Sequence, residues 1–188
     1  MASLKGTNTS IIVFFLMSFA LFNSVFALVQ IHQGCSYDVW CAVVEGYGPD
    51  STVPPSERPP PNWIKQAQGS MLVDKFLSHP KDIGVAIMCT RNKDASPIEV
   101  TQVEYTWEPK NGKTWFDVSN VAGDPFVAEG FGMVVDDPVK PLFDTCKGAY
   151  CGPGDQNCAD VYMKWNDDFQ GMRTCSDAVT ITLVLCSG

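Results

Sequence analysis

Residues 103–119 read VEYTWEPKNGKTWFDVS, two segments of alternating apolar and polar residues around the turn-forming sequence PKNG. Alternation with period two, in β-branched and aromatic residues, is typical of an antiparallel hairpin. A four-residue loop at 109–112 pairs Glu104 with Asp117, whereas a two-residue turn pairs Glu104 with Ser119. In either register Glu104 and Asp117 share a face, which destabilises the sheet unless water, a cation or a ligand compensates.

The rest of the chain also favours strands over helices. Alternation of the same kind predicts strands over 37–44, 83–89, 131–135 and 179–186. Proline-rich sequence at 49–62 cannot lie inside a sheet, and a Gly- and Cys-rich loop follows at 144–158. Several short strands separated by turn signals, with no repeat or coiled-coil pattern, predict one all-β sandwich or barrel.

The first 27 residues have the features of a secretory signal peptide. Lys5 supplies a positive start, 11–22 an apolar run, and Ala27 a small residue at the cleavage position. The apolar run is shorter than the roughly 20 residues that a membrane-spanning helix needs. Cleavage after Ala27 would leave 161 of the 188 residues as a single domain, 28–188. We therefore expect a secreted protein, without membrane insertion.

Composition excludes several classes of function. The net charge of −8 disfavours nonspecific binding to nucleic acid or anionic membranes. Neither His32 nor His79 lies in a nucleophile motif, and the sequence has no Gly-x-Ser-x-Gly segment or phosphate-binding loop. Serine-nucleophile chemistry is therefore not expected, and we expect no cofactor, no metal and a monomeric state.

Eight cysteines follow the predicted leader, an even number that indicates four disulfides in a secreted chain. A zinc site is not indicated because no Cys-x-x-Cys pair occurs. Eight cysteines allow about 105 pairings. Cys41 and Cys89 lie on the apolar faces of predicted strands, so a bridge between them would cross the core. Cys35 and Cys186 lie at the outer ends of the first and last of these strands and would tie the termini together.

Four segments are distinctive: CSYDVW at 35–40, EYTW…WFDVSNVAGDPF at 104–126, CADVYMKWNDD…C at 158–175 and VTITLVLC at 179–186. Together and in this order, they resemble the motifs of the thaumatin-like family. The short chain and the Gly-Asp-Pro-Phe sequence make it most similar to the small fungal secreted thaumatin-like antigens, including the yeast-phase-specific kind. The resemblance implies a thaumatin-like β-sandwich with four disulfides.

The resemblance also implies a pairing of the cysteines. It implies the bridges Cys35–Cys186, Cys146–Cys175 and Cys151–Cys158. Cys41 and Cys89 are left to pair with each other, in agreement with their places on the predicted strands.

Thaumatin-like proteins carry an acidic cleft, and by motif its Glu and Asp fall on Glu104 and Asp117. The family's cleft Arg precedes the Glu, but 94–103 contains no Arg and Arg91 lies too far upstream to match. Trp115 shares the face of the two acids and could stack on a sugar ring.

Three further acids are candidates for the same cleft: Asp160, Asp167 and Asp168.

Several functions are compatible with such a cleft. Glu104, Asp117 and Trp115 would bind an extracellular or cell-wall polysaccharide of the β-1,3-glucan type. Carboxyls about 5–9 Å apart also cleave glycosides, so a weak endo-β-1,3-glucanase is an alternative, although a non-enzymatic role is favoured. A third hypothesis is a secreted antigen, adhesin or effector that contacts a host protein through the proline-rich loop 53–61. Finally, the acids could form an ordinary solvated face.

Overall fold

The computed structural model describes residues 27–47, 52–139, 143–166 and 171–188. The strands are β1 (Leu28–Gln33), β2 (Val39–Glu45), β3 (Ile64–Gln66), β4 (Met71–Lys75), β5 (Gly84–Thr90), β6 (Thr101–Glu108), β7 (Lys113–Ser119), β8 (Phe131–Asp136), β9 (Ala149–Cys151), β10 (Arg173–Ser176) and β11 (Thr180–Leu185). Three short 3-10 helices are η1 (Pro55–Glu57), η2 (Phe76–Ser78) and η3 (Pro109–Asn111). The described residues are thus all-β, as the sequence predicts. The predicted leader falls outside them except for Ala27.

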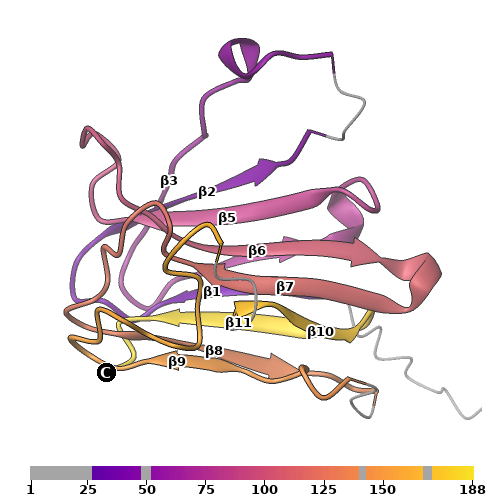
Figure 1. The fold of residues 1–188 in the computed structure, drawn as a ribbon. Coiled ribbons are helices and arrows are strands. Elements are labelled where there is room, and N and C mark those ends of the chain that lie inside the picture. Colours follow the sequence, from indigo (N-terminus) through magenta and orange to yellow (C-terminus); the bar gives the residue numbers. More distant parts are fainter. Residues whose placement is uncertain (1–26, 48–51, 140–142, 167–170) are drawn as a thin grey trace, which may run out of the picture.

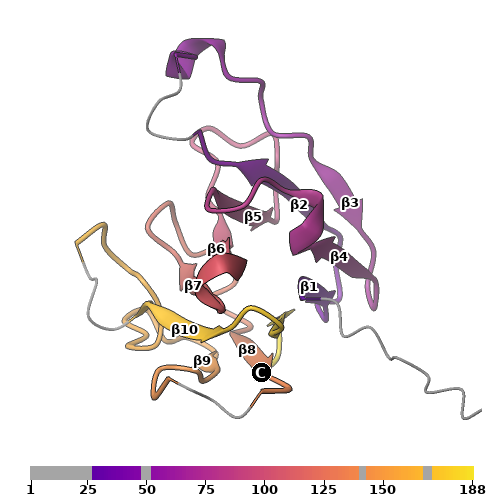
Figure 2. The ribbon, with the colours of Figure 1, turned by 90° about the vertical axis from the view of Figure 1, so that its right-hand side faces the viewer.

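The strands form two sheets, which lie one above the other in Figure 1. The six-stranded sheet has the order β10-β7-β6-β5-β2-β3, and the five-stranded sheet has the order β4-β1-β11-β8-β9. Neighbouring strands are antiparallel except for β1 and β11, which pair in parallel. The view in Figure 2, turned by 90°, shows the segment with η1 extending beyond the sheets.

The core lies between the two sheets and follows from the alternation in their strands. In β6, Val103 and Tyr105 are buried and face inward, while the residues between them face outward. Ile181 and Leu183 of β11 do the same from the other sheet. These two strands therefore present one apolar face to the core and leave the other face outside it.

The hairpin of β6 and β7 has the register given by the four-residue loop. Glu104 is directly opposite Asp117, so the alternative pairing of Glu104 with Ser119 is wrong. The loop turns through η3 and ends at Gly112, whose φ of 63° lies in the left-handed region that glycine adopts without strain.

Four disulfides cross-link the sandwich, in the pairs that the resemblance implies. They are Cys35–Cys186, Cys41–Cys89, Cys146–Cys175 and Cys151–Cys158. Cys41 and Cys89 are register partners on β2 and β5, with their Cα atoms 4.2 Å apart. The other three bridges hold the chain ends and the region around β9.

Five strands were not predicted from the sequence: β1, β3, β4, β9 and β10. Two of them, β3 and β9, have only three residues each, too few for a period to be recognised. Among the described residues, no helix has the length and apolar character needed to cross a membrane.

Candidate functional site

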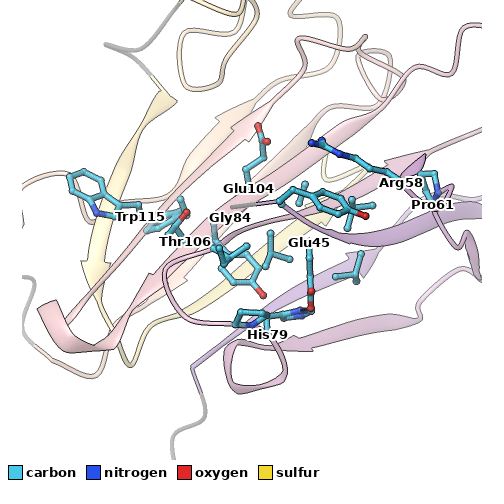
Figure 3. A pocket seen from close by; sticks show the side chains of 18 of the residues that line it. Glu45, Arg58, Pro61, His79, Gly84, Glu104, Thr106 and Trp115 are labelled. Atoms are coloured by element: carbon cyan, nitrogen blue, oxygen red, sulfur yellow. Dashed lines mark hydrogen bonds and ion pairs between the residues drawn. The ribbon is translucent and has the colours of Figure 1, made fainter. Parts of the chain in front are cut away.

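A groove of about 1220 Å³ runs over the outer face of the six-stranded sheet, the face turned away from the core. Its floor comes from the outward-facing residues of β5, β6 and β7, and includes Gly84, Ala86, Glu104 and Thr106. Gly84 and Ala86 have almost no side chain, so the floor beside Glu104 is low. Figure 3 shows Glu104 rising from this floor. The open space next to a carboxyl group is a consequence of small residues on the neighbouring strand.

Glu104 and Asp117 both line the groove and are directly opposite on β6 and β7. Side chains paired in this way have Cβ atoms about 5 Å apart. Asp117 is buried, with 7% of its surface exposed, whereas Glu104 is half-buried. In the described part of the chain, Asp117 Oδ1 has no hydrogen-bond partner. A carboxyl oxygen that is buried without a partner costs stability unless it is protonated or meets a hydrogen-bond donor, which a ligand could supply.

The electrostatics of the pair explain how two acids tolerate this proximity. Burial, and secondarily the charge of Glu104, raise the pKa of Asp117 from 3.8 to about 8, against a smaller opposing effect of Arg173. Burial also raises the pKa of Glu104, which a hydrogen bond from Gln102 partly offsets. At neutral pH Asp117 therefore keeps its proton, and the pair carries at most one negative charge. The like-charge repulsion expected from the sequence is avoided in this way.

Arg173 lies close to the acid pair but is not part of the groove wall. It is almost fully buried on β10, where its guanidinium donates to the carbonyl oxygens of Gly148 and Gly171. Its Nη2 is 3.7 Å from Oδ1 of Asp160. The charge of Arg173 lowers the pKa of Asp117, but not enough to overcome burial. Sequence reasoning missed this residue because the pairing of β10 with β7 was not predicted.

Aromatic side chains stand at opposite sides of the groove. Trp115 is 36% exposed and lines one side, with Lys113 Nζ 4.5 Å from the centre of its ring. Tyr47 lines the other side, where the guanidinium carbon of Arg58 is 4.2 Å from the centre of its ring. In Figure 3, Glu104 lies between Trp115 and Arg58. The groove thus combines flat apolar surfaces with a few polar groups, the usual composition of a small-molecule or sugar site.

The arginine that lines the groove, Arg58, comes from the proline-rich segment. The sequence contains no Arg just before Glu104, and Arg58 lines the groove from a loop 46 positions upstream. Arg91 is not among the lining residues; its Nη1 lies 3.3 Å from Oε1 of Glu129 and its guanidinium stacks on Tyr37. The proline-rich loop, a candidate surface for protein contacts, thus also contributes part of a groove wall.

A second titratable cluster closes one end of the groove, where His79 and Glu45 appear together in Figure 3. His79 lies between two carboxylates, with Nδ1 2.6 Å from Glu45 and Nε2 2.7 Å from Asp74. Tyr105 donates a 2.7 Å hydrogen bond to the other oxygen of Asp74. Burial lowers the pKa of His79, but the hydrogen bonds to Asp74 and Glu45 outweigh it and raise the pKa overall. The imidazole ring bridges Asp74 of β4 to Glu45 of β2 and so connects the two sheets.

Of the three further acids predicted for the cleft, only Asp160 lies among the described residues. Asp160 is not among the groove residues; its Oδ2 accepts a hydrogen bond from the backbone N–H of Tyr150. Asp167 and Asp168 lie outside the described residues.

One group of potential metal ligands occurs among the described residues, made of Asp137, Cys146 and Cys175. Both sulfurs belong to a disulfide, and Asp137 accepts hydrogen bonds from the backbone and side chain of Ser176. These three residues are accounted for by structural bonds and do not fit a metal.

The class of protein follows from these features together with the similarity of the chain to known protein families and structures. Two stacked sheets, four disulfides and an acid-lined groove on the larger sheet are those of a thaumatin-like protein. Residues 29–187 match the family model described as Blastomyces yeast-phase-specific protein. The chain belongs to this family.

A sequence relative and two solved structures agree with this assignment. The secreted thaumatin-like protein calA of Emericella nidulans is 35% identical over 121 residues, which are 62% of this chain and 63% of that protein's length. The chain thus spans less than two thirds of that relative. The protein elicitor MoHrip2 from Magnaporthe oryzae superimposes with a TM-score of 0.59 at 15% identity, over 86% of this chain and 99% of that one. The thaumatin-like xylanase inhibitor TLXI gives a TM-score of 0.50 at 12% identity, over 84% and 98% of the two chains. At these identities the two structures show the fold alone.

Proposed function

We propose that the protein is a secreted, extracellular carbohydrate-binding protein whose groove holds a neutral cell-wall polysaccharide of the β-glucan type. The observation that carries this proposal is the acid pair, a half-buried Glu104 opposite a buried Asp117 with an unpartnered oxygen, beside the exposed ring of Trp115. Four disulfides are typical of proteins that fold in an oxidising compartment, which supports the extracellular location. The similarity to a secreted relative is in agreement.

The chemistry of the pair suits sugar hydroxyl groups. An ionised Glu104 accepts hydrogen bonds from hydroxyls, and a protonated Asp117 both donates and accepts them. A hydrogen bond to an ionised group is roughly twice as strong as one between neutral groups. Trp115 offers an apolar plane against which the C–H face of a pyranose packs. The negative charge of Glu104 and the net charge of −8 disfavour anionic polysaccharides.

Sedimentation with insoluble polysaccharides tests this proposal. The oxidised protein is incubated with β-glucan, chitin, xylan and an anionic polysaccharide, beside the variant Glu104→Gln with Asp117→Asn. We expect retention on β-glucan by the wild type and loss of retention in the folded double variant, since amides replace the charge and the acid proton. No retention on any neutral polysaccharide by the folded wild type would overturn the proposal.

A second candidate function is contact with a host protein, as an antigen, adhesin or effector. It is favoured by the proline-rich loop 53–61, whose described side chains are mostly exposed and which extends beyond the sheets. Loops of this kind carry recognition surfaces more often than core elements do. Capture of a protein from host-cell extract that is unaffected by Glu104→Gln with Asp117→Asn would favour this candidate. Loss of capture in the double variant would count against it.

Weak hydrolysis of β-1,3-glucan is a further possibility for the same pair. Opposed carboxyls of unequal pKa are the groups that a glycosidase uses as acid and as nucleophile or base. Release of reducing sugar from β-1,3-glucan by the wild type, but not by the double variant, would establish it. Binding without any release would leave the protein a carbohydrate-binding module.

A further inference from the structure

A second depression, of about 320 Å³, adjoins the groove at the acid pair. Glu104, Asp117 and Met172 line both hollows, so the two meet at the carboxyl groups. The remaining walls of this second depression are formed by Gln102, Ser119, Val121, Tyr162 and Trp165. The acids therefore lie at the middle of a longer channel and not at its end.

Trp165 is an exposed aromatic residue on the wall of this depression. Its side chain is 83% exposed, more than that of any other large apolar residue described. Val121 and Met172, at the same depression, are also exposed apolar side chains. Exposed apolar residues that gather at a concave site, and not singly on the surface, mark a place of contact with a ligand. An indole also supplies a flat face with little conformational entropy to lose on binding.

The backbone fixes this wall to the sheet. The N–H of Tyr162 donates to the carbonyl of Val118 at 2.9 Å, and the N–H of Asn120 donates to the carbonyl of Tyr162 at 2.8 Å. Ser119 and Tyr162 accordingly form a parallel β-bridge beside the end of β7. The segment before Trp165 thus continues the sheet on the side of the second depression, and the depression is part of the fold.

The outward-facing residues of β7 give the length of the channel. Trp115, Asp117 and Ser119 follow one another on the outer face. At about 3.4 Å per residue, Trp115 and Ser119 are roughly 14 Å apart. Trp165 lies at the Ser119 end. This span exceeds one sugar ring, and both of its ends carry an aromatic side chain.

We propose that the ligand is a linear neutral oligosaccharide or polysaccharide that lies across the acid pair, and that Trp165 forms an additional sugar subsite by stacking on a unit remote from Trp115. This inference rests on the proposed carbohydrate-binding function and specifies the ligand as a chain of several units. A free monosaccharide would fill only one part of the channel. A longer chain would gain affinity from each additional subsite.

Isothermal titration with linear β-1,3-gluco-oligosaccharides of increasing length tests the subsite. Three proteins are compared: wild type, Trp165→Ala and the matched control Tyr150→Ala, which removes an exposed aromatic from the other sheet. For wild type and control, affinity should rise with length and then level off. Trp165→Ala should bind the shortest ligands like wild type but lose about threefold to tenfold for the longest, the contribution of one aromatic contact.

The outcomes separate the two proposals. Length-dependent binding that is unchanged in Trp165→Ala would overturn the subsite and leave the proposed function intact. Equal weakening for short and long ligands would also overturn it, because a remote subsite cannot act on a ligand too short to reach it. If no oligosaccharide of any length binds the folded wild type, both proposals are overturned.

Discussion

Replacing Asp117 by Asn should stabilise the protein, by an amount that increases with pH. The folded state raises the pKa of Asp117 from 3.8 to about 8. One pKa unit corresponds to about 1.4 kcal/mol, so the ionised side chain is disfavoured in the fold by up to about 6 kcal/mol. Below about pH 4 both the folded and unfolded chains carry the proton, and no stability is lost. Between about pH 4 and 8 only the folded state keeps it, so stability falls as pH rises through this window.

Asparagine has nearly the shape of the protonated acid and does not ionise. We therefore expect Asp117→Asn to change the free energy of unfolding little at about pH 4 and to raise it by about 2–5 kcal/mol at about pH 8. For a chain of this length, 1 kcal/mol shifts Tm by roughly 2–4 °C, so the gain is readily measured. The assay is thermal unfolding of the oxidised protein, followed by circular dichroism at both pH values.

Asp144→Asn is the matched control, because it removes the same formal charge from an exposed loop position. At about pH 8 it should shift Tm by less than Asp117→Asn does. An Asp117→Asn gain of equal size at about pH 4 and pH 8, or a loss of stability at about pH 8, would refute the reasoning. Either result would mean that the Asp117 carboxyl is ionised in the folded protein at neutral pH.

Three further outcomes are expected. His79→Gln should lower the free energy of unfolding by about 1–3 kcal/mol below about pH 6.5, and by less as pH rises through the raised pKa of the imidazole. Denaturant titrations at a series of pH values measure this loss. Equal loss at all pH values would contradict a charged His79. Joint replacement of Cys41 and Cys89 by Ser should lower the free energy of unfolding by about 2–4 kcal/mol, measured in urea; an unchanged midpoint would contradict a stabilising bridge. Trp115→Ala should weaken oligosaccharide binding about threefold to tenfold by calorimetry, whereas equal affinity would exclude stacking at that ring.

The strands with long alternating patterns could be predicted from the sequence because each buries one complete face. The hairpin of β6 and β7 is the best case: alternation located both strands, and the loop length limited the register to two choices. Short strands such as β3 and β9 could not be predicted in this way, since three residues do not define a period. Their positions depend on pairing with strands distant in the sequence.

The candidate site likewise combines residues that the local sequence predicts with residues that it does not. Glu104, Asp117 and Trp115 were predicted because they share one face of one hairpin, a local property of the sequence. Arg58 and Tyr47 could not be predicted, because a proline-rich segment with no periodicity carries the guanidinium to the groove. The raised pKa of Asp117 could not be predicted either, since burial is its main cause and depends on the packing of the whole sheet.

The most direct test of the account is chemical-shift mapping of the ¹⁵N-labelled, oxidised protein with a soluble linear β-1,3-gluco-oligosaccharide. We predict that the largest changes fall on the outer face of the six-stranded sheet, at 84–86, 104–106 and 115–119. The residues of β1 and β11, on the other sheet, should change little. Changes centred on the five-stranded sheet, or no change at a saturating ligand concentration, would contradict the assignment of the groove as a carbohydrate site.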